Sequence, residues 1–382
     1  MNTSRGVSET RLLAEFEWCH RHPELSLSEF ETTKHILNTL EQIRGVELLE
    51  LGLQTGVLAK ITGNPGGPTV ALRADIDALP ITEESGLPYA SEIPERMHAC
   101  GHDFHTTVLL GTAELLAQRR AQLPGTAVLL FQPAEETAQG AAQVVETGVL
   151  QRLNIREIFA LHARPALSPG VIAVAPGPFS AAVDRFLYRI TGSGGHASAP
   201  ETTKDPIPAA ARLVGALQEI ISRQVSPLDT AVLSVTRITA GSTWNVIPDN
   251  AELEGTVRSF HPMVRQNILD AMERQAQTLT AEGYQVDFQW LPGCPATNND
   301  AGLAELIRRT AEKAGFQVIP QKPDMSGEDF ACYQEHIPGA LFHVGTGGHH
   351  PIHNARFTVD EAALAPAAEL LADIAEAALN RL

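Results

Sequence analysis

The sequence predicts an α/β protein that carries a second, inserted domain. Short runs of β-branched and other apolar residues alternate with stretches of helical periodicity, which is the pattern of a sheet covered by helices. Residues 184–290 depart from this pattern, because their predicted elements follow the order β-α-β-β-α-β, and the first pattern then returns. We therefore predict a discontinuous domain with a mixed sheet flanked by helices, interrupted by an α+β insertion.

The elements of the main domain are predicted from both ends of the chain. Two helices over 8–21 and 28–42 are separated by a turn at His22-Pro23, and further helices are predicted over 104–118, over 140–147 and after Glu361. The predicted strands share a high content of Val, Ile, Leu and Ala, and they cover Val57–Ile61, Thr69–Arg73, Thr126–Phe131, Ile158–His162 and Ala340–Val344.

The insertion is complete in itself and resembles a ferredoxin-like unit. Its boundaries fall near Pro176–Pro178 and Leu291–Gly293, which have the proline and glycine content of hinges. The main domain is thus expected over 1–178 and 293–382, and the insertion over 179–292. The predicted elements of the insertion are, in order, Arg185–Thr191, a helix over 207–223, Ala231–Ile238, Glu252–Arg258, a helix over Pro262–Ala281, and Gln285–Trp290.

Length, charge and cysteine content exclude several classes of protein. A chain of 382 residues exceeds what one core usually serves, which favours two domains, and its formal charge of −17 disfavours nucleic acid or an anionic membrane as a partner. No apolar run is long enough to span a bilayer, and residues 1–9 do not resemble a signal peptide, so we expect a cytoplasmic protein. The cysteines are far apart, which predicts free thiols with at most one metal ligand among Cys19, Cys100, Cys294 and Cys332.

Residues Met97–His105 contain three imidazoles, a thiol and a carboxylate, a composition typical of a metal site. Cys100 and His102 stand two apart, and Gly101 between them gives the backbone freedom for both side chains to reach one ion. The spacing matches neither a Cys-x-x-Cys finger nor a His-Glu-x-x-His helix. A loop with a buried thiol and surface histidines is the alternative for any one residue, but the cluster favours a metal site.

Polar residues follow three of the predicted strands. Asp75 and Asp77 come after one strand, Glu135 and Glu136 after another, and His162 ends a third. Sites in α/β sheets form at the carboxyl ends of strands, so we expect these side chains to meet at one edge. Each also has an ordinary alternative: turn or cap residues for the aspartates, a solvated helix start for the glutamates, and a core histidine for His162.

Six motifs together resemble the M20 metallopeptidase family, and among its branches most resemble the aminoacylase-like amidohydrolases, which include hippurate hydrolase and indoleacetyl-amino-acid hydrolase. The resemblance runs nearly from end to end and keeps the order of the motifs. They are Ala71–Pro80, Met97–His105, Phe131–Glu136, Gly194–Ala197, Asn245–Asp249 and Met325–Phe330.

The resemblance implies a site for two divalent metal ions, Zn²⁺ or Mn²⁺ with Co²⁺ also acceptable to such donors. It implies a metal-bound water as the nucleophile and Glu135 as the general base that later protonates the leaving amine. In the His349–His353 run only the last histidine matches the pattern, and a polar loop is the alternative for the first two. The implied ligands are Cys100, His102, Glu136, His162 and His353. The supporting carboxylates that we expect to orient them are Asp75, Asp77 and Asp103.

Further residues of the insertion acquire a role only through this resemblance. His196 lies in a glycine-rich turn and could simply be a turn residue, but the family pattern has it reach the active site of a partner subunit and stabilise the oxyanion. Asn245 and Arg258 would bind the carboxylate of the substrate. The insertion would then be both a lid and a dimerisation domain, in a homodimer or a higher homo-oligomer.

The expected reaction is hydrolysis of N-acyl-L-amino acids with an acetyl, benzoyl or indoleacetyl group. A dipeptidase or carboxypeptidase on the same scaffold is one alternative, and a non-catalytic metal-binding or ligand-binding protein is another. The chain departs from the usual family pattern at three places, namely Pro200-Glu201, Asn354 and Ser326-Gly327. None of them removes a ligand or the base, and the first two bear on the preference for acyl group and amino acid.

Overall fold

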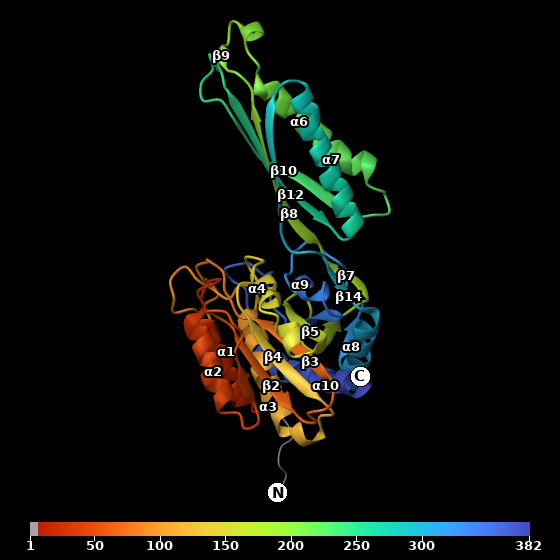
Figure 1. Ribbon diagram of the computed structural model, residues 1–382. Helices are drawn as coiled ribbons and strands as arrows, with labels where there is room; N and C mark the ends of the chain where they lie inside the picture. The colour runs from red at the N-terminus through yellow and green to blue at the C-terminus, as the bar shows by residue number, and fades with distance from the viewer. Residues whose placement is uncertain (1–6) are drawn as a thin grey trace. The chain divides into compact units, whose positions relative to one another are not determined.

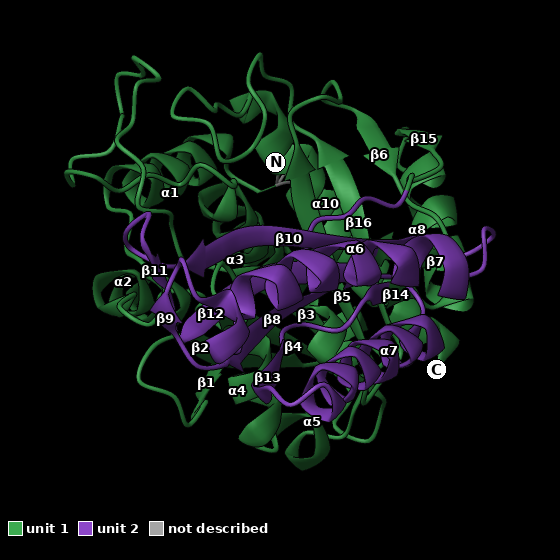
Figure 2. Cartoon of the chain, turned by 90° about the horizontal axis from the view of Figure 1, so that it is seen from above, with its two compact units in different colours: residues 1–179, 298–322, 329–382 green, residues 180–297, 323–328 purple. Residues whose placement is uncertain are grey.

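The computed structural model of the protein describes residues 7–382 (Figure 1). The predicted absence of a signal peptide rests largely on residues 1–6, which lie outside the described residues. The chain divides into two compact units, coloured separately in Figure 2. Unit 1 comprises residues 1–179, 298–322 and 329–382, and unit 2 comprises residues 180–297 and 323–328. Unit 2 therefore includes a short later segment in addition to a continuous insertion.

Unit 1 is built on a mixed sheet. Its strands within residues 7–382 are β1 (Glu47–Leu49), β2 (Val57–Thr62), β3 (Thr69–Asp75), β4 (Thr126–Gln132), β5 (Ile155–Arg164), β6 (Val171–Ala173), β15 (Gln317–Ile319) and β16 (Gly339–Gly345). They lie in the order β1-β2-β4-β3-β5-β16-β6-β15. The central strands β4, β3, β5 and β16 run parallel, whereas β2 and β6 run antiparallel to their neighbours β4 and β16. The carboxyl ends of four neighbouring strands thus share one edge.

Helices cover both faces of this sheet (Figure 1). Along β3, Val70 and Leu72 join one core and Ala71 joins the other, as expected for side chains that alternate across a strand. The helices that pack on the first face are α1 (Glu9–Arg21), α2 (Phe30–Glu41), α3 (His102–Gln118), α8 (Ala301–Lys313) and α10 (Leu364–Arg381). Those on the second face are α4 (Gly140–Glu146), α5 (Val149–Arg152) and α9 (Ala331–Gln334).

The start of α3 is fixed by a glycine. Gly101 precedes the helix with φ of 90°, a left-handed conformation that glycine adopts without strain. A Cβ atom at this position would lie 2.9 Å from Cβ of Ala163 in β5, so the close approach also requires glycine. The turn brings Cys100 and the first residues of α3 against the end of β5.

Unit 2 has an antiparallel sheet with two helices on one face. Its elements are β8 (Ala182–Thr191), α6 (Pro206–Gln224), β10 (Ala231–Ala240), β12 (Asn250–Ser259), α7 (Pro262–Ala281) and β13 (Gln285–Pro292). The strand order β10-β12-β8-β13, with every neighbouring pair antiparallel, is that of a ferredoxin-like unit. Apolar residues of α6 and α7 form one core with the strands, including Leu213, Ile268 and Tyr188.

The remaining elements are short. They are β7 (Gly177–Ser180), β9 (Gly195–His196), β11 (Val246–Ile247) and β14 (Thr297–Asn299), with single 3₁₀ turns η1 (Arg120–Gln122), η2 (Pro200–Thr202) and η3 (Glu361–Ala363). β9 pairs with β11, and β7 pairs with β14.

The predicted α/β class with a mixed sheet flanked by helices is confirmed. The sequence missed the three-residue strands β1, β6 and β15, which carry too little periodicity to be recognised. It also ended one strand early: β5 continues to Arg164, so His162 lies inside the strand and not at its last residue. Within residues 7–382, no helix has the length and apolar character needed to cross a membrane.

Candidate metal centre

The polar residues expected near strand ends lie at the carboxyl edge of the parallel strands. Asp75 is the last residue of β3 and pairs with Gln132, the last residue of β4. His162 on β5 pairs with His343 on β16, close to where both strands end. The segment after β4 carries the two glutamates, and the loop after β16 leads to His353.

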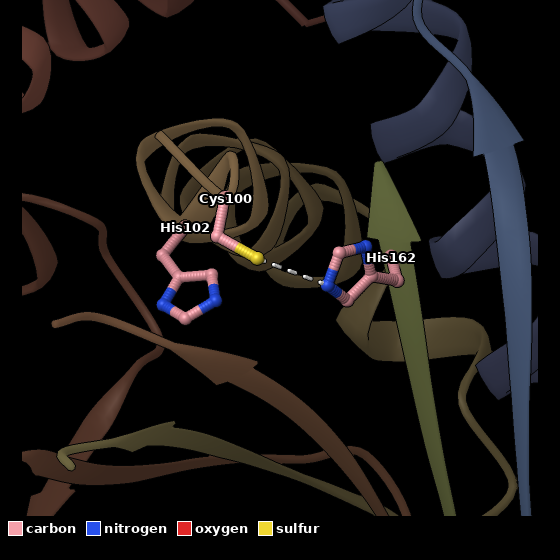
Figure 3. A group of neighbouring side chains, drawn as sticks. All are labelled: Cys100, His102 and His162. Carbon is pink, nitrogen blue, oxygen red and sulfur yellow. Dashed lines mark hydrogen bonds between the residues drawn. The ribbon is translucent and has the colours of Figure 1, made fainter. Parts of the chain in front are cut away.

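Cys100, His102 and His162 form the first part of the centre (Figure 3). Cys100 Sγ points toward the ring of His162 and lies 3.6 Å from its Nε2 atom. The Nδ1 atom of His162 donates to the carbonyl oxygen of Ala163 at 2.8 Å, so the lone pair of the ring is on Nε2, which faces Cys100. Burial raises the pKa of the Cys100 thiol well above its usual value, so a bound cation is needed to favour the thiolate.

Glu135 and Glu136 both face His102. An extended pair would have pointed to opposite sides, but residues 135–138 form a turn, and α4 begins only at Gly140. Glu135 Oε2 and Glu136 Oε1 each lie 3.9 Å from His102 Nε2. The glutamates are therefore not the solvated start of a helix, which was the alternative for them.

His353 completes this set from a loop far along the chain. Its Nε2 atom lies 3.5 Å from Glu136 Oε1, and its backbone N–H donates to the carbonyl oxygen of Ala99 at 2.7 Å. It has φ of 62°, a conformation that a residue with a side chain seldom adopts, and the bond to Ala99 holds the loop next to Cys100. Cys100, Glu136 and His353 offer ligand atoms within 4.8 Å of one another.

Within residues 7–382, two buried atoms of the centre have no hydrogen-bond partner, namely His102 Nε2 and Glu136 Oε1. Leaving a buried polar atom unpaired costs about 1–3 kcal/mol, so two such atoms at one point indicate a missing partner. A divalent metal ion fits, because imidazole, thiolate and carboxylate are the donors that zinc and manganese bind in proteins. The residues that would hold such ions are the five predicted ligands, which overlap in the groups around Cys100 and His102.

Two of the predicted supporting carboxylates contact candidate ligands. Asp77 lies with its carbonyl oxygen 2.9 Å and its Oδ1 atom 3.2 Å from Nδ1 of His102. Its Oδ2 atom accepts the backbone N–H of Glu136 at 3.0 Å. Asp75 Oδ2 lies 3.7 Å from His102 Nε2, and its Oδ1 atom lies 2.5 Å from Nδ1 of His105. The third, Asp103, instead bonds His20 at 2.6 Å and contacts none of the five ligands by a hydrogen bond.

The carboxylates make this point of the protein favour positive charge. Burial by itself lowers the pKa of His102, but the charge of Asp75 and the hydrogen bond with Asp77 raise it well above its usual value. Burial by itself raises the pKa of Asp75, yet the neighbouring His102, His105 and Arg73 hold it well below its usual range. These carboxylates would stabilise a positive charge at His102 Nε2, whether it comes from a proton or from a metal ion.

Sequence reasoning missed a buried polar network behind Asp75. Arg73 donates from Nη1 to Asp75 Oδ2 at 2.6 Å and from Nη2 to Asp329 Oδ1 at 2.8 Å. Gln132 donates to both oxygens of Asp329, at 3.0 and 2.9 Å. An arginine inside an apolar strand was the available signal, because a buried guanidinium requires buried carboxylates.

The predicted residues of unit 2 fall into two places. His196 in β9 pairs with Val246 in β11, and the N–H of Ala197 donates to the carbonyl oxygen of Asn245 at 3.1 Å. Arg258 lies near the far end of β12, eight residues after Asn250, the first residue of that strand. At about 3.4 Å per residue, Arg258 is roughly 27 Å from Asn250. Unit 2 therefore brings His196 and Asn245 together and leaves Arg258 apart from them.

His349 and His350 do not join the metal-ligand groups found within residues 7–382. They line a cavity of about 350 Å³ together with Arg164 and Ile352. The polar-loop alternative describes these two histidines.

The chain is similar in sequence and in fold to known proteins. Residues 71–377 match Peptidase family M20/M25/M40. The chain is 47% identical over 368 residues to an N-acetylcysteine deacetylase of Bacillus subtilis, covering 96% of each chain. It is 38% identical over 369 residues to the IAA-amino acid hydrolase ILR1-like 4 of Arabidopsis thaliana, covering 93% of this chain and 83% of that one.

A solved structure from Bacillus subtilis, described as a dinuclear metal binding peptidase from the M20 family, is also similar. It superposes with a TM-score of 0.89 at 44% identity, over 98% of this chain and 99% of that chain. The likeness thus includes the fold of both units as well as the sequence.

Proposed function

The chain belongs to Peptidase family M20/M25/M40 and is a hydrolase of that family, and from this premise we propose that it cleaves the amide bond of N-acyl-L-amino acids. The products would be a carboxylic acid and a free amino acid, and the acyl group would be of the acetyl, benzoyl or indoleacetyl type. The observation that carries the proposal is the convergence of a thiol, three imidazoles and two glutamates. Two buried atoms of this set, His102 Nε2 and Glu136 Oε1, have no hydrogen-bond partner among the described residues. The cytoplasm is the proposed location, in keeping with the absence of a disulfide bond among Cys19, Cys100, Cys294 and Cys332.

The proposed cofactor is a pair of divalent ions, Zn²⁺ or Mn²⁺, with Co²⁺ as a further candidate. Cys100, His102, Glu136, His162 and His353 would hold them, and Asp75 and Asp77 would orient His102 through the contacts described above. When bound, such ions polarise the amide carbonyl and lower the pKa of a water molecule.

Glu135 is the proposed general base. Its side chain is 11% exposed, and its Oε2 atom lies within 3.9 Å of His102 Nε2, so it borders the proposed metal centre without being one of the five ligands. In the proposed reaction Glu135 accepts the proton of the water whose oxygen attacks the acyl carbon. It then gives that proton to the amide nitrogen as the carbon–nitrogen bond breaks, so that the amino acid leaves as a neutral amine.

His196, supplied by a partner subunit, is proposed to stabilise the oxyanion, and Asn245 and Arg258 are proposed to bind the substrate carboxylate. The layout of unit 2 supports a contribution from two copies of the chain: His196 and Asn245 lie together beyond the Asn250 end of β12, whereas Arg258 lies eight residues farther along that strand, roughly 27 Å from Asn250. The edge strand β10 supports a homodimer as well, because Val232 and Ile238 expose apolar side chains along it.

Hydrolysis of a panel of substrates tests the proposal. Chelator-stripped protein would be assayed on N-acetyl, N-benzoyl and N-indoleacetyl amino acids and on dipeptides, before and after Zn²⁺, Mn²⁺ or Co²⁺ is added. We expect metal-dependent release of the amino acid from at least one N-acyl substrate. Cleavage confined to dipeptides would favour the peptidase alternative, and tight metal binding without any cleavage would favour a non-catalytic protein.

A further inference from the structure

Glu29, at the beginning of α2, is a buried carboxylate to which sequence reasoning gave no role. Its side chain is fully buried, with 0% exposure. It accepts three hydrogen bonds: Oε1 accepts the backbone N–H groups of Leu27 at 3.0 Å and Ala134 at 2.8 Å, and Oε2 accepts the hydroxyl of Thr55 at 2.9 Å. The bond to Ala134 joins residues 105 positions apart in the chain.

Both amides that share Oε1 belong to residues in the left-handed region. Leu27 has φ of 64° and Ala134 has φ of 55°, and such a conformation costs a non-glycine residue about 1–2 kcal/mol. A backbone conformation of this kind persists only when its surroundings hold it. The carboxylate of Glu29 supplies a partner for both residues at one atom.

Ala134 determines where the turn with the two glutamates begins. It directly precedes Glu135, and its carbonyl oxygen accepts the N–H groups of Gln139 and Gly140 at 3.2 and 3.1 Å. Glu29 therefore holds the backbone N–H of Ala134, and the start of α4 holds its carbonyl oxygen. The direction in which the segment enters the turn follows from these bonds.

The loop that contains Glu29 also supports the second glutamate. Ser26 donates from its hydroxyl to Asp77 Oδ2 at 2.6 Å, and the same oxygen accepts the N–H of Glu136 at 3.0 Å. Residues 26–29 thus connect to the turn on both sides of Glu135, once through Ala134 and once through Asp77.

We propose that Glu29 is a positioning residue that holds Glu135 and Glu136 in place for catalysis and metal binding. The inference rests on the proposed function for the role of Glu135. Glu29 acts through the acceptor atom Oε1 and not through its charge. A glutamine at this position keeps one carbonyl oxygen for both amides, and its NH₂ group can donate to Thr55 Oγ1. An aspartate keeps the charge but withdraws the carboxylate by about one carbon–carbon bond, roughly 1.5 Å.

The test compares Glu29→Ala, Glu29→Gln and Glu29→Asp in the full-length protein. Glu24→Ala is the matched control, because Glu24 lies in the same loop and accepts the N–H of Thr32 at 2.8 Å without a bond to residues 134–136. The readouts are kcat and KM on an N-acyl amino acid that the wild type cleaves, and the Kd for Zn²⁺ or Mn²⁺ from calorimetric titration of chelator-stripped protein.

We expect Glu29→Ala to lower kcat about 10–100-fold with KM changed less than about threefold, and to raise the metal Kd about tenfold. Glu29→Gln should stay within about threefold of the wild type in all three quantities, and Glu29→Asp should fall below Glu29→Gln. The control should leave kcat and the metal Kd unchanged. If Glu29→Ala does not fold, the order of the glutamine and aspartate variants decides.

An aspartate variant more active than the glutamine variant would overturn the proposal, since charge would then be the required property. Equal kcat for Glu29→Ala and the control would overturn it as well. If the wild type cleaves no substrate in the panel, the proposed function fails and the metal titration decides: weaker binding in Glu29→Ala alone supports the positioning role, and equal binding in every variant rejects it.

Discussion

His102 and Asp103 are neighbours in sequence, yet they belong to two different buried centres made of the same chemical groups. His102 lies in the candidate metal centre, where its Nδ1 atom contacts Asp77 and its Nε2 atom has no hydrogen-bond partner among the described residues. Asp103 turns the other way and bonds Nδ1 of His20 at 2.6 Å, while Nε2 of His20 bonds Glu83 at 3.1 Å. In the metal centre one ring nitrogen of the histidine has no partner among the described residues, and we call this the open centre. In the second centre both ring nitrogens of His20 are hydrogen-bonded, and we call this the closed centre.

The difference shows that complete hydrogen bonding, and not residue type, separates a structural histidine from a candidate ligand. Burial by itself lowers the pKa of His20, but its bonds to Asp103 and Glu83 raise it to about 9, so the ring is an imidazolium at neutral pH. Its positive charge is fully matched by the protein. The charges around His102 call for a cation in the same way, but the protein leaves the atom that would receive it unpaired.

The largest expected effect concerns the residue that borders the open centre without being a ligand. Glu135→Gln should lower kcat by about 10²–10⁴-fold, because the amide cannot accept the proton of the attacking water. Metal stoichiometry, measured by atomic absorption on the purified variant, should not change. Glu84→Gln, at an exposed position, serves as the control. Full activity in Glu135→Gln would remove this residue from the base role.

Removing a ligand of the metal centre should weaken metal binding more than it lowers the stability of the metal-free protein. His102→Ala should weaken binding of Zn²⁺ or Mn²⁺ by more than the 10–100-fold typical of losing a supporting residue, because it removes a ligand atom. The wild type should gain about 4 kcal/mol of unfolding free energy at a metal concentration 1,000 times the Kd, and the variant should lose most of that gain. A variant that keeps the whole metal-induced shift in Tm would show that His102 is not a ligand.

Removing His20, the histidine of the closed centre, should lower the stability of the protein and leave metal binding nearly unchanged. His20→Ala leaves Asp103 and Glu83 buried without their shared cation, at 1% and 4% side-chain exposure, and should cost about 3–5 kcal/mol in urea unfolding of the metal-free protein. The metal Kd should stay within about threefold. Arg21→Ala, which breaks a half-exposed pair with Glu17, should cost less than about 1 kcal/mol. A strong loss of metal affinity in His20→Ala would mean that the two centres are coupled.

The smallest effect is a dependence of stability on pH. The pKa of His20 is raised from 6.5 to about 9 in the folded protein, so between these values the folded state binds a proton that the unfolded state does not. This contribution, about 3 kcal/mol, is fully present below pH 6.5 and is lost as the pH rises through about 9. Urea unfolding of metal-free wild type and His20→Gln from pH 6 to 9.5 should show a steeper decline for the wild type. Parallel curves would show that His20 is not the titrating group.

The sequence by itself determined the elements and the chemistry that they carry. The apolar run Thr69–Arg73 and the helical spacing of residues 104–118 are local patterns, and they predicted β3 and α3 to within two residues at each end. The metal-binding residue types around Cys100 and the glutamate pair after β4 are likewise found within short segments of the sequence. Short strands such as β6 were missed because three residues hold no period to recognise.

Only the tertiary structure decided which of these groups meet. The stretch Met97–His105 contains three histidines, and the packing of α3 against β5 directs His102 into the metal centre, His105 toward Asp75, and Asp103 away to His20. The bond from Ala134 to Glu29 joins residues more than a hundred positions apart. Contacts of this kind depend on how the sheet and helices pack, and no local spacing encodes that arrangement.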